Sequence, residues 1–415
     1  MQRSRYLRLV DRMLALDPEA TGLLVSAPGR TELAGNHTDH QHGNVLAAAV
    51  DLDCVAAISP NRQPLVELVS AGIAEPIVVS LDDLSPRPDE RGKPAALVRG
   101  MAAMIAAEIG SISGFRGAVH STCPSGAGLS TSAAFSVLIG TAFTLLGADR
   151  SISAERLARM AQEAENRYFG KPCGLMDQMS SAVGGILAID FHQPEQPLLQ
   201  PLPLTVTLAG YSLVVVDTGG DHTSLTAEYA AIPEEMRAAA RVLGHDSGRG
   251  VTRDELLATL PAIRRQAGDR AALRLLHFVE EDLRAQRMRR ALAAGDIRSY
   301  LALVRASGKS SCMLLQNCAN PGNTREQGIL LGLAVSERFC PEAVARVHGG
   351  GFAGTIQAYV PHRDLRQYSQ EMSGIFGEKA VIPLRIGRPG ACGLHRYGSI
   401  SLVLECQGGR RWPDM

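Results

Sequence analysis

The glycine-rich segment CPSGAGLSTSAAF, residues 123–135, constrains the fold most. It follows an expected strand at 114–124 and opens a long apolar helix at 128–147. Glycines let a ligand approach the backbone closely, and the free N–H groups of a helix N-terminus attract anions. The hydroxyls of Ser130, Thr131 and Ser132 can add donors or reach a magnesium ion. The segment indicates a phosphate cradle; the alternative is a tight strand-to-helix turn whose glycines only pack.

Two other phosphate-binding patterns do not fit the chain. A Rossmann fingerprint requires a second strand soon after the helix, ending in an acid, but Asp149 follows an unbroken helix. A Walker A loop requires GxxxxGK[ST], and the position five before Gly308 is Leu303.

Length and composition predict a two-domain globular protein. A chain of 415 residues exceeds what one core usually supports, so we expect domains at residues 1–195 and 196–415. The 42 basic residues balance 42 acidic ones, so charge gives no reason to expect nucleic acid or an anionic membrane as a partner. No apolar stretch is long enough to span a bilayer, and the eight scattered cysteines are typical of reduced thiols. We therefore expect a cytoplasmic protein.

Hydrophobic periodicity predicts an α+β fold of mixed sheets covered by helices. Apolar runs indicate strands at 22–30 (ended by Pro28-Gly29), 44–60, 65–72, 184–191, 212–219, 353–361 and 400–405. Helices are expected at 92–110 and 153–170, and residues 230–307 read as helical throughout.

Two further segments carry candidate chemistry. In ARVHGGGFAGTIQAYV, residues 345–360, three consecutive glycines suggest a backbone that turns sharply against something, although Phe352 also suits a core position. In EAENRYFGKPCGLMDQMSS, residues 163–181, Glu165 lies on a helix and Asp177 follows a turn. A single aspartate in such a place is usually a helix cap or turn residue.

The segment GRTELAGNHTDHQHG, residues 29–43, is unusually rich in histidine and acids. HTDHQH approaches the HxHxDH zinc pattern of the metallo-β-lactamase hydrolases. That pattern requires histidine at 35 and 37, and position 35 is glycine. A zinc hydrolase is therefore an alternative that lacks one ligand.

Taken together and in this order, these segments resemble the GHMP small-molecule kinases, and among them the galactokinases. The family's three motifs resemble PGRTELAGNHTDHQHGNVL (28–46), PSGAGLSTSAA (124–134) and GGGFAG (349–354). GLMDQ (174–178) and TAEYA (226–230) match galactokinase-type segments. The resemblance covers nearly the whole chain and is weakest from about 240 to 340. It implies a two-domain kinase fold with the active site at the domain interface.

The resemblance also implies roles for individual residues. Asp177 matches the family's catalytic carboxylate, which accepts the proton of the anomeric hydroxyl, and Arg30 matches the arginine that holds this carboxylate ionised. ATP and Mg²⁺ are the implied cofactors. Ser132 and Glu165 match the magnesium ligands, and the triphosphate would be wrapped by Gly126, Ala127, Gly128, Leu129, Ser130, Thr131 and Ser132. The implied sugar-binding residues are Asn36, His37, Thr38, Asp39, Gly174 and Tyr229.

Several positions depart from the family pattern. Galactokinases usually have EHTD where this chain has Asn36-His37-Thr38-Asp39, and that glutamate meets the C6 hydroxyl of the sugar. Asparagine is neutral and can donate, so it would also accommodate a C6 carboxylate. Glu32 stands where the family has asparagine, and DHQ (39–41) is reminiscent of galacturonate kinases. Thr131 and Ala353 are milder changes.

The resemblance predicts an ATP-dependent kinase that phosphorylates C1–OH of a hexose, with galactose as the expected sugar. A uronic-acid 1-kinase is the nearest alternative, and a catalytically silent sugar sensor is another. Retention of Arg30, Asp177, Ser132 and Glu165 argues against the sensor.

Overall fold

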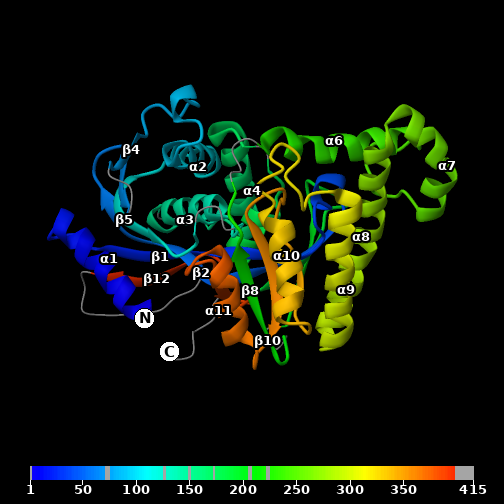
Figure 1. The fold of residues 1–415 in the computed structure, drawn as a ribbon. Coiled ribbons are helices and arrows are strands. Elements are labelled where there is room, and N and C mark those ends of the chain that lie inside the picture. Colours follow the sequence, from blue (N-terminus) through cyan, green and yellow to red (C-terminus); the bar gives the residue numbers. More distant parts are fainter. Residues whose placement is uncertain are drawn as a thin grey trace.

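The computed structural model describes residues 2–70, 75–124, 128–147, 151–171, 173–203, 208–220 and 225–397. It confirms the predicted α+β class, with two sheets and helices packed against both (Figure 1). The strand expected at 400–405 lies outside the described residues. Within the described ranges, no helix is long and apolar enough to cross a bilayer.

The larger sheet has eight strands. Its main order is β12-β1-β2-β5-β3-β4, and β6 pairs with both β2 and β7. All of these pairs are antiparallel except β3 with β5. The strands are β1 (Gly22–Ala34), β2 (Asn44–Asn61), β3 (Leu65–Ser70), β4 (Ile77–Ser80), β5 (Gly114–Ser121), β6 (Ile186–Asp190), β7 (Leu198–Leu202) and β12 (Cys392–Tyr397).

The expectation that Pro28-Gly29 ends the first strand is wrong, because β1 continues to Ala34. Its register with β2 shifts between Pro28 and Arg30. Proline has no N–H to donate to a neighbouring strand. A shift in register beside the proline lets the strand continue past it. The continuation carries Arg30 and Glu32 into the interior of the protein.

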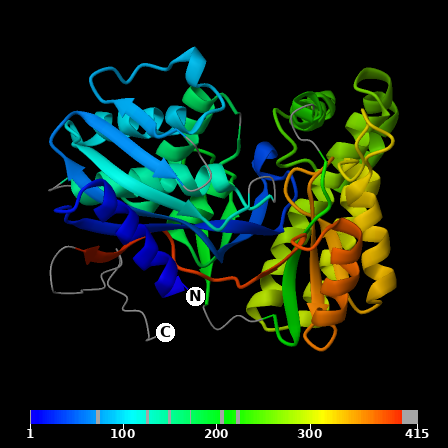
Figure 2. The ribbon, with the colours of Figure 1, turned by 60° about the vertical axis from the view of Figure 1, so that its left-hand side comes forward.

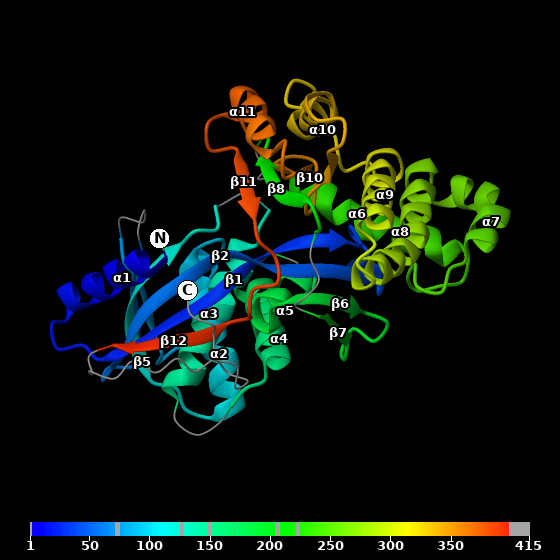
Figure 3. The same ribbon diagram turned by 90° about the horizontal axis from the view of Figure 1, so that it is seen from below.

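Helices cover both faces of the larger sheet. One face packs against α2 (Pro94–Ile109), α3 (Thr131–Leu146), α4 (Ala154–Ala164) and α5 (Met176–Val183) around an apolar core. The helix α1 (Gln2–Leu16) lies on the opposite face, where Leu9 and Met13 pack on Leu24 and Val55 (Figure 3). Short helical turns occur at η1 (Asp39–Gln41), η2 (Pro88–Glu90) and the π-helical η3 (Glu165–Phe169).

The smaller sheet is antiparallel, in the order β11-β8-β10-β9. Its strands are β8 (Tyr211–Asp217), β9 (Val344–Val347), β10 (Thr355–Pro361) and β11 (Val381–Leu384). One face packs on α10 (Gly328–Phe339) and α11 (Leu365–Phe376). The other face shares a core with β1, β2 and β6 of the larger sheet, so the two sheets stand side by side (Figure 2).

The predicted helical region 230–307 is described throughout and contains no strand. It holds most of α6 (Thr226–Val242), with α7 (Arg253–Gln266), α8 (Asp269–Ala293) and most of α9 (Ile297–Ser310), and the π-helical η5 (Ser311–Leu315) follows. The helix α8 contacts β2 and β1, which brings this helical layer against the segment that follows β1.

The chain crosses between the sheets twice. It leaves the larger sheet after β7 and returns from β11 through residues 385–391 to β12, which pairs with β1. The predicted division at residues 195 and 196 stays a prediction. The larger sheet includes β12, which comes from the C-terminal end of the described chain, so it contains strands from both sides of the predicted boundary.

Candidate active site

Arg30 and Asp177 lie 147 positions apart in the sequence but meet in the structure. Arg30 projects from β1 and Asp177 from the first turn of α5, and Arg30 Nε donates to Asp177 Oδ1 at 2.5 Å. Arg30 also donates to the carbonyl of Gly128. The Arg30 side chain is 7% exposed and that of Asp177 is 22% exposed. The carboxylate is therefore fixed on one side and open to a ligand on the other.

The environment favours the ionised form of Asp177. Burial opposes ionisation, but the charge of Arg30 and hydrogen bonds from Arg30 and Ser130 outweigh it, so the pKa of Asp177 lies below its ordinary value. Ser130 Oγ donates to Asp177 Oδ2. Ser130 has φ +55° and does not cap α3 with its side chain. Ser130 occupies the N-cap position of α3, but its hydroxyl binds the carboxylate of Asp177 rather than an N–H group of the helix.

Ser132 and Glu165 form a second polar pair beside the first. Ser132 Oγ donates to Glu165 Oε1 at 2.7 Å, and Gln178 Nε2 donates to Glu165 Oε2 at 2.7 Å. The ammonium of Lys171 lies 3.4 Å from Glu165 Oε1. A hydroxyl and a carboxylate are the oxygen donors that Mg²⁺ prefers, and Mg²⁺ usually takes its remaining ligands from water and phosphate. The pair therefore fits a magnesium ion bound together with a nucleotide.

The expected phosphate segment is described only in part. Gly126 and Ala127 lie outside the described residues. The carbonyl of Leu129 accepts from Arg30 N at 3.2 Å, and Thr131 opens α3 with its hydroxyl 3.4 Å from the carbonyl of Pro124. The described part therefore joins Arg30 to the N-terminus of α3, where unpaired N–H groups favour an anion.

Asn36 lies between the candidate site and the protein interior, with no exposed surface. Its Nδ2 donates to Gly349 O at 2.8 Å and to both Glu32 carboxylate oxygens at 3.3 Å. Its Oδ1 accepts from Asn317 Nδ2 at 2.9 Å and from Ser311 Oγ at 3.2 Å. Every hydrogen-bonding group of the Asn36 amide is thus engaged within the protein.

His37 and Thr38 follow Asn36 in the same segment. His37 has φ +58°, and its Nε2 lies 3.0 Å from Gly350 O, so Nε2 carries the proton and Nδ1 is the acceptor nitrogen. Burial and the charge of His40 lower the pKa of His37 to about 3, which makes the ring neutral at pH 7. Thr38 is buried, and its Oγ1 contacts the carbonyls of Gly35 at 2.9 Å and Asn44 at 2.7 Å. Thr38 therefore holds the segment in shape.

Gly174 lies directly against the carboxylate of Asp39. A Cβ at position 174 would stand 1.9 Å from Asp39 Oδ2, so no larger residue fits without moving that carboxylate. Asp39 Oδ1 accepts from His40 N at 2.9 Å, and the side chain is 11% exposed. The structure thus brings together two residues of the predicted sugar set that are 135 positions apart.

Tyr229 and the third glycine segment meet at the start of α6. Tyr229 Oη donates to Gly351 O at 2.9 Å, and the Tyr229 ring packs edge-on against Phe352 with centroids 5.4 Å apart. Burial raises the pKa of Tyr229 to about 12. Gly351 has φ +86°, and a Cβ there would stand 2.2 Å from Asn317 O. The sharp turn expected at these glycines is present, and Phe352 is buried in the helical core, as its sequence context suggested.

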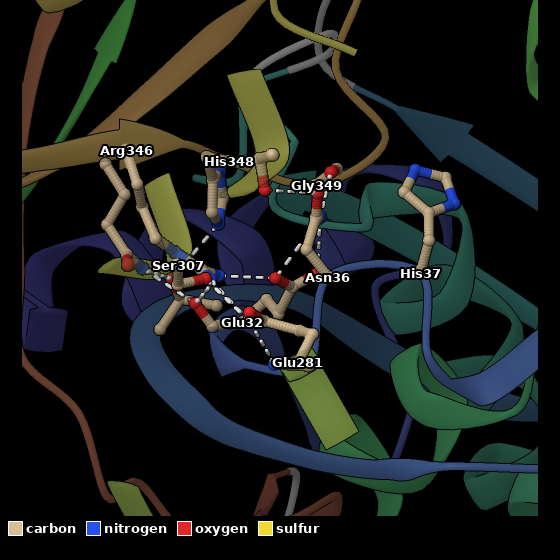
Figure 4. A network of polar contacts seen from close by, with 12 residues as sticks. Glu32, Asn36, His37, Glu281, Ser307, Arg346, His348 and Gly349 are labelled. Carbon is tan, nitrogen blue, oxygen red and sulfur yellow. Dashed lines mark hydrogen bonds and ion pairs between the residues drawn. The ribbon is translucent and has the colours of Figure 1, made fainter. Parts of the chain in front are cut away.

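A buried charge network that sequence analysis missed lies behind Asn36 (Figure 4). Glu32 pairs with Arg346 of β9; their side chains are 3% and 0% exposed. Arg346 donates to Ser307 Oγ at 3.0 Å, and Ser307 donates to the buried Glu281 at 2.6 Å. Burial outweighs the attraction of Arg346 and raises the pKa of Glu32. An arginine inside the apolar run VARV was the signal that could have indicated this network.

The histidine-rich segment does not assemble a metal site. His37 and His40 have ring centroids 5.7 Å apart. Over the described ranges, no group of three or more His, Cys, Asp or Glu side chains is placed to hold a metal ion. The zinc-hydrolase alternative therefore gains no support from the arrangement of these residues.

Comparisons with known proteins identify relatives of the chain. A family model described as the GHMP kinases N terminal domain matches residues 96–185, and one described as the galactokinase galactose-binding signature matches residues 17–60. The galactokinase of Streptomyces coelicolor is 34% identical over 337 residues, covering 80% of this chain and 82% of that protein. Human galactokinase is 33% identical over 342 residues, with the same two shares, 80% and 82%.

A solved structure also resembles the chain. Lactococcus lactis galactokinase, complexed with galactose, has a TM-score of 0.77 and 23% sequence identity, over 90% of this chain and 95% of that one. At this identity the likeness shows a shared fold.

Proposed function

The chain belongs to the galactokinase family of GHMP kinases, and from this premise we propose that it transfers the terminal phosphate of ATP to the anomeric hydroxyl of galactose. The family resemblance seen in the sequence is thereby confirmed. The observation that carries the chemistry is the contact between Arg30 and the partly exposed Asp177.

In the proposed reaction, the C1 oxygen of the sugar bonds to the terminal phosphorus while the bond to ADP breaks, and the hydroxyl proton passes to Asp177. A carboxylate with a lowered pKa is a weak base but is fully ionised at neutral pH. That suffices when phosphoryl transfer proceeds through a loose transition state, because the hydroxyl needs orientation more than early deprotonation. Arg30 keeps Asp177 ionised and adds positive charge beside the transferred group.

We propose that the nucleotide lies along Gly126 to Ser132 at the N-terminus of α3. Ser132 and Glu165 would hold Mg²⁺, which supplies charge neutralisation to the phosphates when bound. The 2.7 Å contact between their side-chain oxygens and the near-complete burial of Glu165 support this assignment. A buried carboxylate that already accepts from Ser132, Gln178 and Lys171 is held in place before a ligand arrives.

For the sugar we propose contacts from His37, Asp39, Gly174 and Tyr229. Gly174 lies against Asp39, and His37 and Tyr229 both contact the third glycine segment. Asn36 and Thr38 stay predictions as sugar ligands, since each is engaged by protein partners in this structure. The uronic-acid alternative rested on the amide of Asn36, which would accommodate a C6 carboxylate, and on the segment DHQ (39–41). Because that amide already donates to Glu32 and Gly349, the structure adds no support to a C6 carboxylate, and galactose stands as the proposed substrate.

A panel of sugars tests this proposal. ADP release would be measured with galactose, galacturonate, glucuronate, arabinose and N-acetylgalactosamine, and galactose should give the highest kcat/KM. A higher value for either uronate would overturn the choice of sugar. ATP binding without turnover on any sugar would favour the sensor, which the retained Arg30, Asp177, Ser132 and Glu165 argue against.

A further inference from the structure

Lys171 is a cation at the candidate active site to which the mechanism above gives no role. It follows the π-helical turn η3, where the carbonyl of Glu165 accepts both Gly170 N at 3.0 Å and Lys171 N at 3.2 Å. Gly170 has φ +83°, which turns the chain back over the helix end. These contacts place the Lys171 side chain beside the carboxylate of Glu165.

The Lys171 ammonium pairs with the carboxylate of Glu165. Among the described residues, it is the only cation within 4 Å of Glu165, at 3.4 Å from Oε1. Its Nζ donates a hydrogen bond to Glu165 Oε1. Lys171 therefore places a positive charge next to the carboxylate that we assign to Mg²⁺.

The two side chains of the Lys171–Glu165 pair differ in exposure. Glu165 is 2% exposed and is also held by Ser132 and Gln178, whereas the Lys171 side chain is 57% exposed on a flexible stem. The exposed ammonium can therefore leave the pair, while Glu165 keeps its hydrogen bonds from Ser132 and Gln178. An ammonium forms charge-assisted hydrogen bonds with phosphate oxygens as well as with carboxylates. A terminal phosphate, which carries more negative charge than one carboxylate, would therefore compete for Lys171 when it lies beside Glu165.

Resting on the proposed function, we propose that Lys171 contacts the terminal phosphate of ATP, with its ammonium moving from Glu165 to the phosphate oxygens when the nucleotide binds. The contact adds a second positive charge to that of Arg30 during transfer. Phosphoryl transfer is accelerated mainly by positioning and charge neutralisation, so such a contact raises kcat as well as affinity for the triphosphate.

The test compares Lys171→Met, which removes the charge but keeps an unbranched stem, with Lys171→Arg, which keeps the charge. Lys379→Met is the matched control, because Lys379 is exposed in the turn between α11 and β11. Calorimetry would measure binding of ADP and of a non-hydrolysable ATP analogue, both with magnesium. Steady-state kinetics would measure kcat and KM for ATP and galactose.

For Lys171→Met we expect kcat to fall at least about tenfold and the analogue to lose its binding advantage over ADP, with KM for galactose unchanged. Lys171→Arg should recover most of both losses, and Lys379→Met should behave as wild type. Unchanged kcat and unchanged analogue binding in Lys171→Met would overturn the proposal and leave Lys171 as a counter-ion of Glu165. If wild type turned over no sugar, the proposed function would fail, and the binding arm would still decide the role of Lys171.

Discussion

Two arginine–carboxylate pairs begin on the same strand and have opposite characters. Arg30 and Glu32 are two positions apart on β1, so their side chains project to the same side of the sheet. Arg30 holds Asp177, whose side chain is 22% exposed, while Glu32 holds Arg346, which has no exposed surface. One pair faces the ligand space, and the other is enclosed behind Asn36.

The comparison separates two uses of the same chemistry. At Asp177 the arginine outweighs burial and the pKa of the carboxyl is lowered; at Glu32 burial prevails and the pKa is raised. An open ionised carboxylate can accept a proton from a substrate. An enclosed pair cannot reach a substrate, and it instead fixes the loop that carries Asn36 and His37. The proposed catalytic role and the support of the loop therefore belong to two positions of one strand with Thr31 between them.

The largest expected effect is on activity, and we expect it only at the Arg30–Asp177 pair. Asp177→Asn should lower kcat about 1,000-fold, because the amide cannot accept the hydroxyl proton. Binding of ADP, measured by calorimetry, should survive, since Asp177 is not assigned to the nucleotide. Loss of both turnover and ADP binding would mean that Asp177 is structural.

The enclosed Glu32–Arg346 pair should instead affect the free energy of unfolding. Glu32→Leu removes the oxygen acceptors of Arg346 and Asn36, which leaves these buried donors poorly compensated, and should lower the free energy of unfolding by about 3 kcal/mol, measured by urea titration. Arg346→Met, which removes the other partner, is the companion variant and should also destabilise. A Glu32→Leu protein as stable as wild type would show that the network contributes nothing to the fold.

Asn36 contacts Glu32, so a substitution there tests whether the enclosed pair supports the loop. Asn36→Glu would place a second carboxylate beside Glu32 in a buried site and should cost about 2 kcal/mol of stability. The double variant Glu32→Asn/Asn36→Glu restores an amide–carboxylate pair and should recover most of the loss. Additive effects in this double-mutant cycle would contradict the coupling. The sugar panel applied to the double variant would then show whether a glutamate at 36 favours galactose.

The smallest expected effect is on the pH dependence of stability, and its sign differs between the pairs. The pKa of Asp177 lies below 3.8, so its stabilising contribution is present above that pH and is lost as the pH falls through the lowered pKa. The pKa of Glu32 lies above 4.5, so its contribution is present below that pH and is lost as the pH rises through the raised pKa. Differences in unfolding free energy between wild type and each of Asp177→Asn and Glu32→Gln should therefore slope in opposite directions with pH. Parallel slopes would contradict the contrast.

Much of the fold was predictable because the elements are strongly patterned. The apolar strand 44–60, the alanine-rich helix 92–110 and the helical region 230–307 appear as β2, α2 and α6 to α9. Pro28-Gly29 misled the prediction for β1, since proline usually ends a strand and only the register with β2 shows how it is accommodated.

The candidate site was likewise predictable only in part. Arg30, Asp177, Ser132 and Glu165 lie in short motifs, and the family resemblance was enough to bring them together. Ser130 was expected only in the phosphate segment, and its contact with Asp177 depends on a backbone conformation that no local pattern indicated. Arg346 and Glu281 belong to an ordinary strand and a charged helix, so their pairing around Glu32 required the tertiary structure.

The return of the chain to β12 has a mechanical consequence. The two sheets are linked by one passage after β7 and a second at residues 385–391, where Arg385, Gly387 and Arg388 bond to the backbone of Asp51, Ala49 and Gly185. Two covalent links restrict the relative movement of the sheets more than one link would, and the buried core that they share restricts it further. Arg30 on β1 should therefore keep a constant position relative to the smaller sheet.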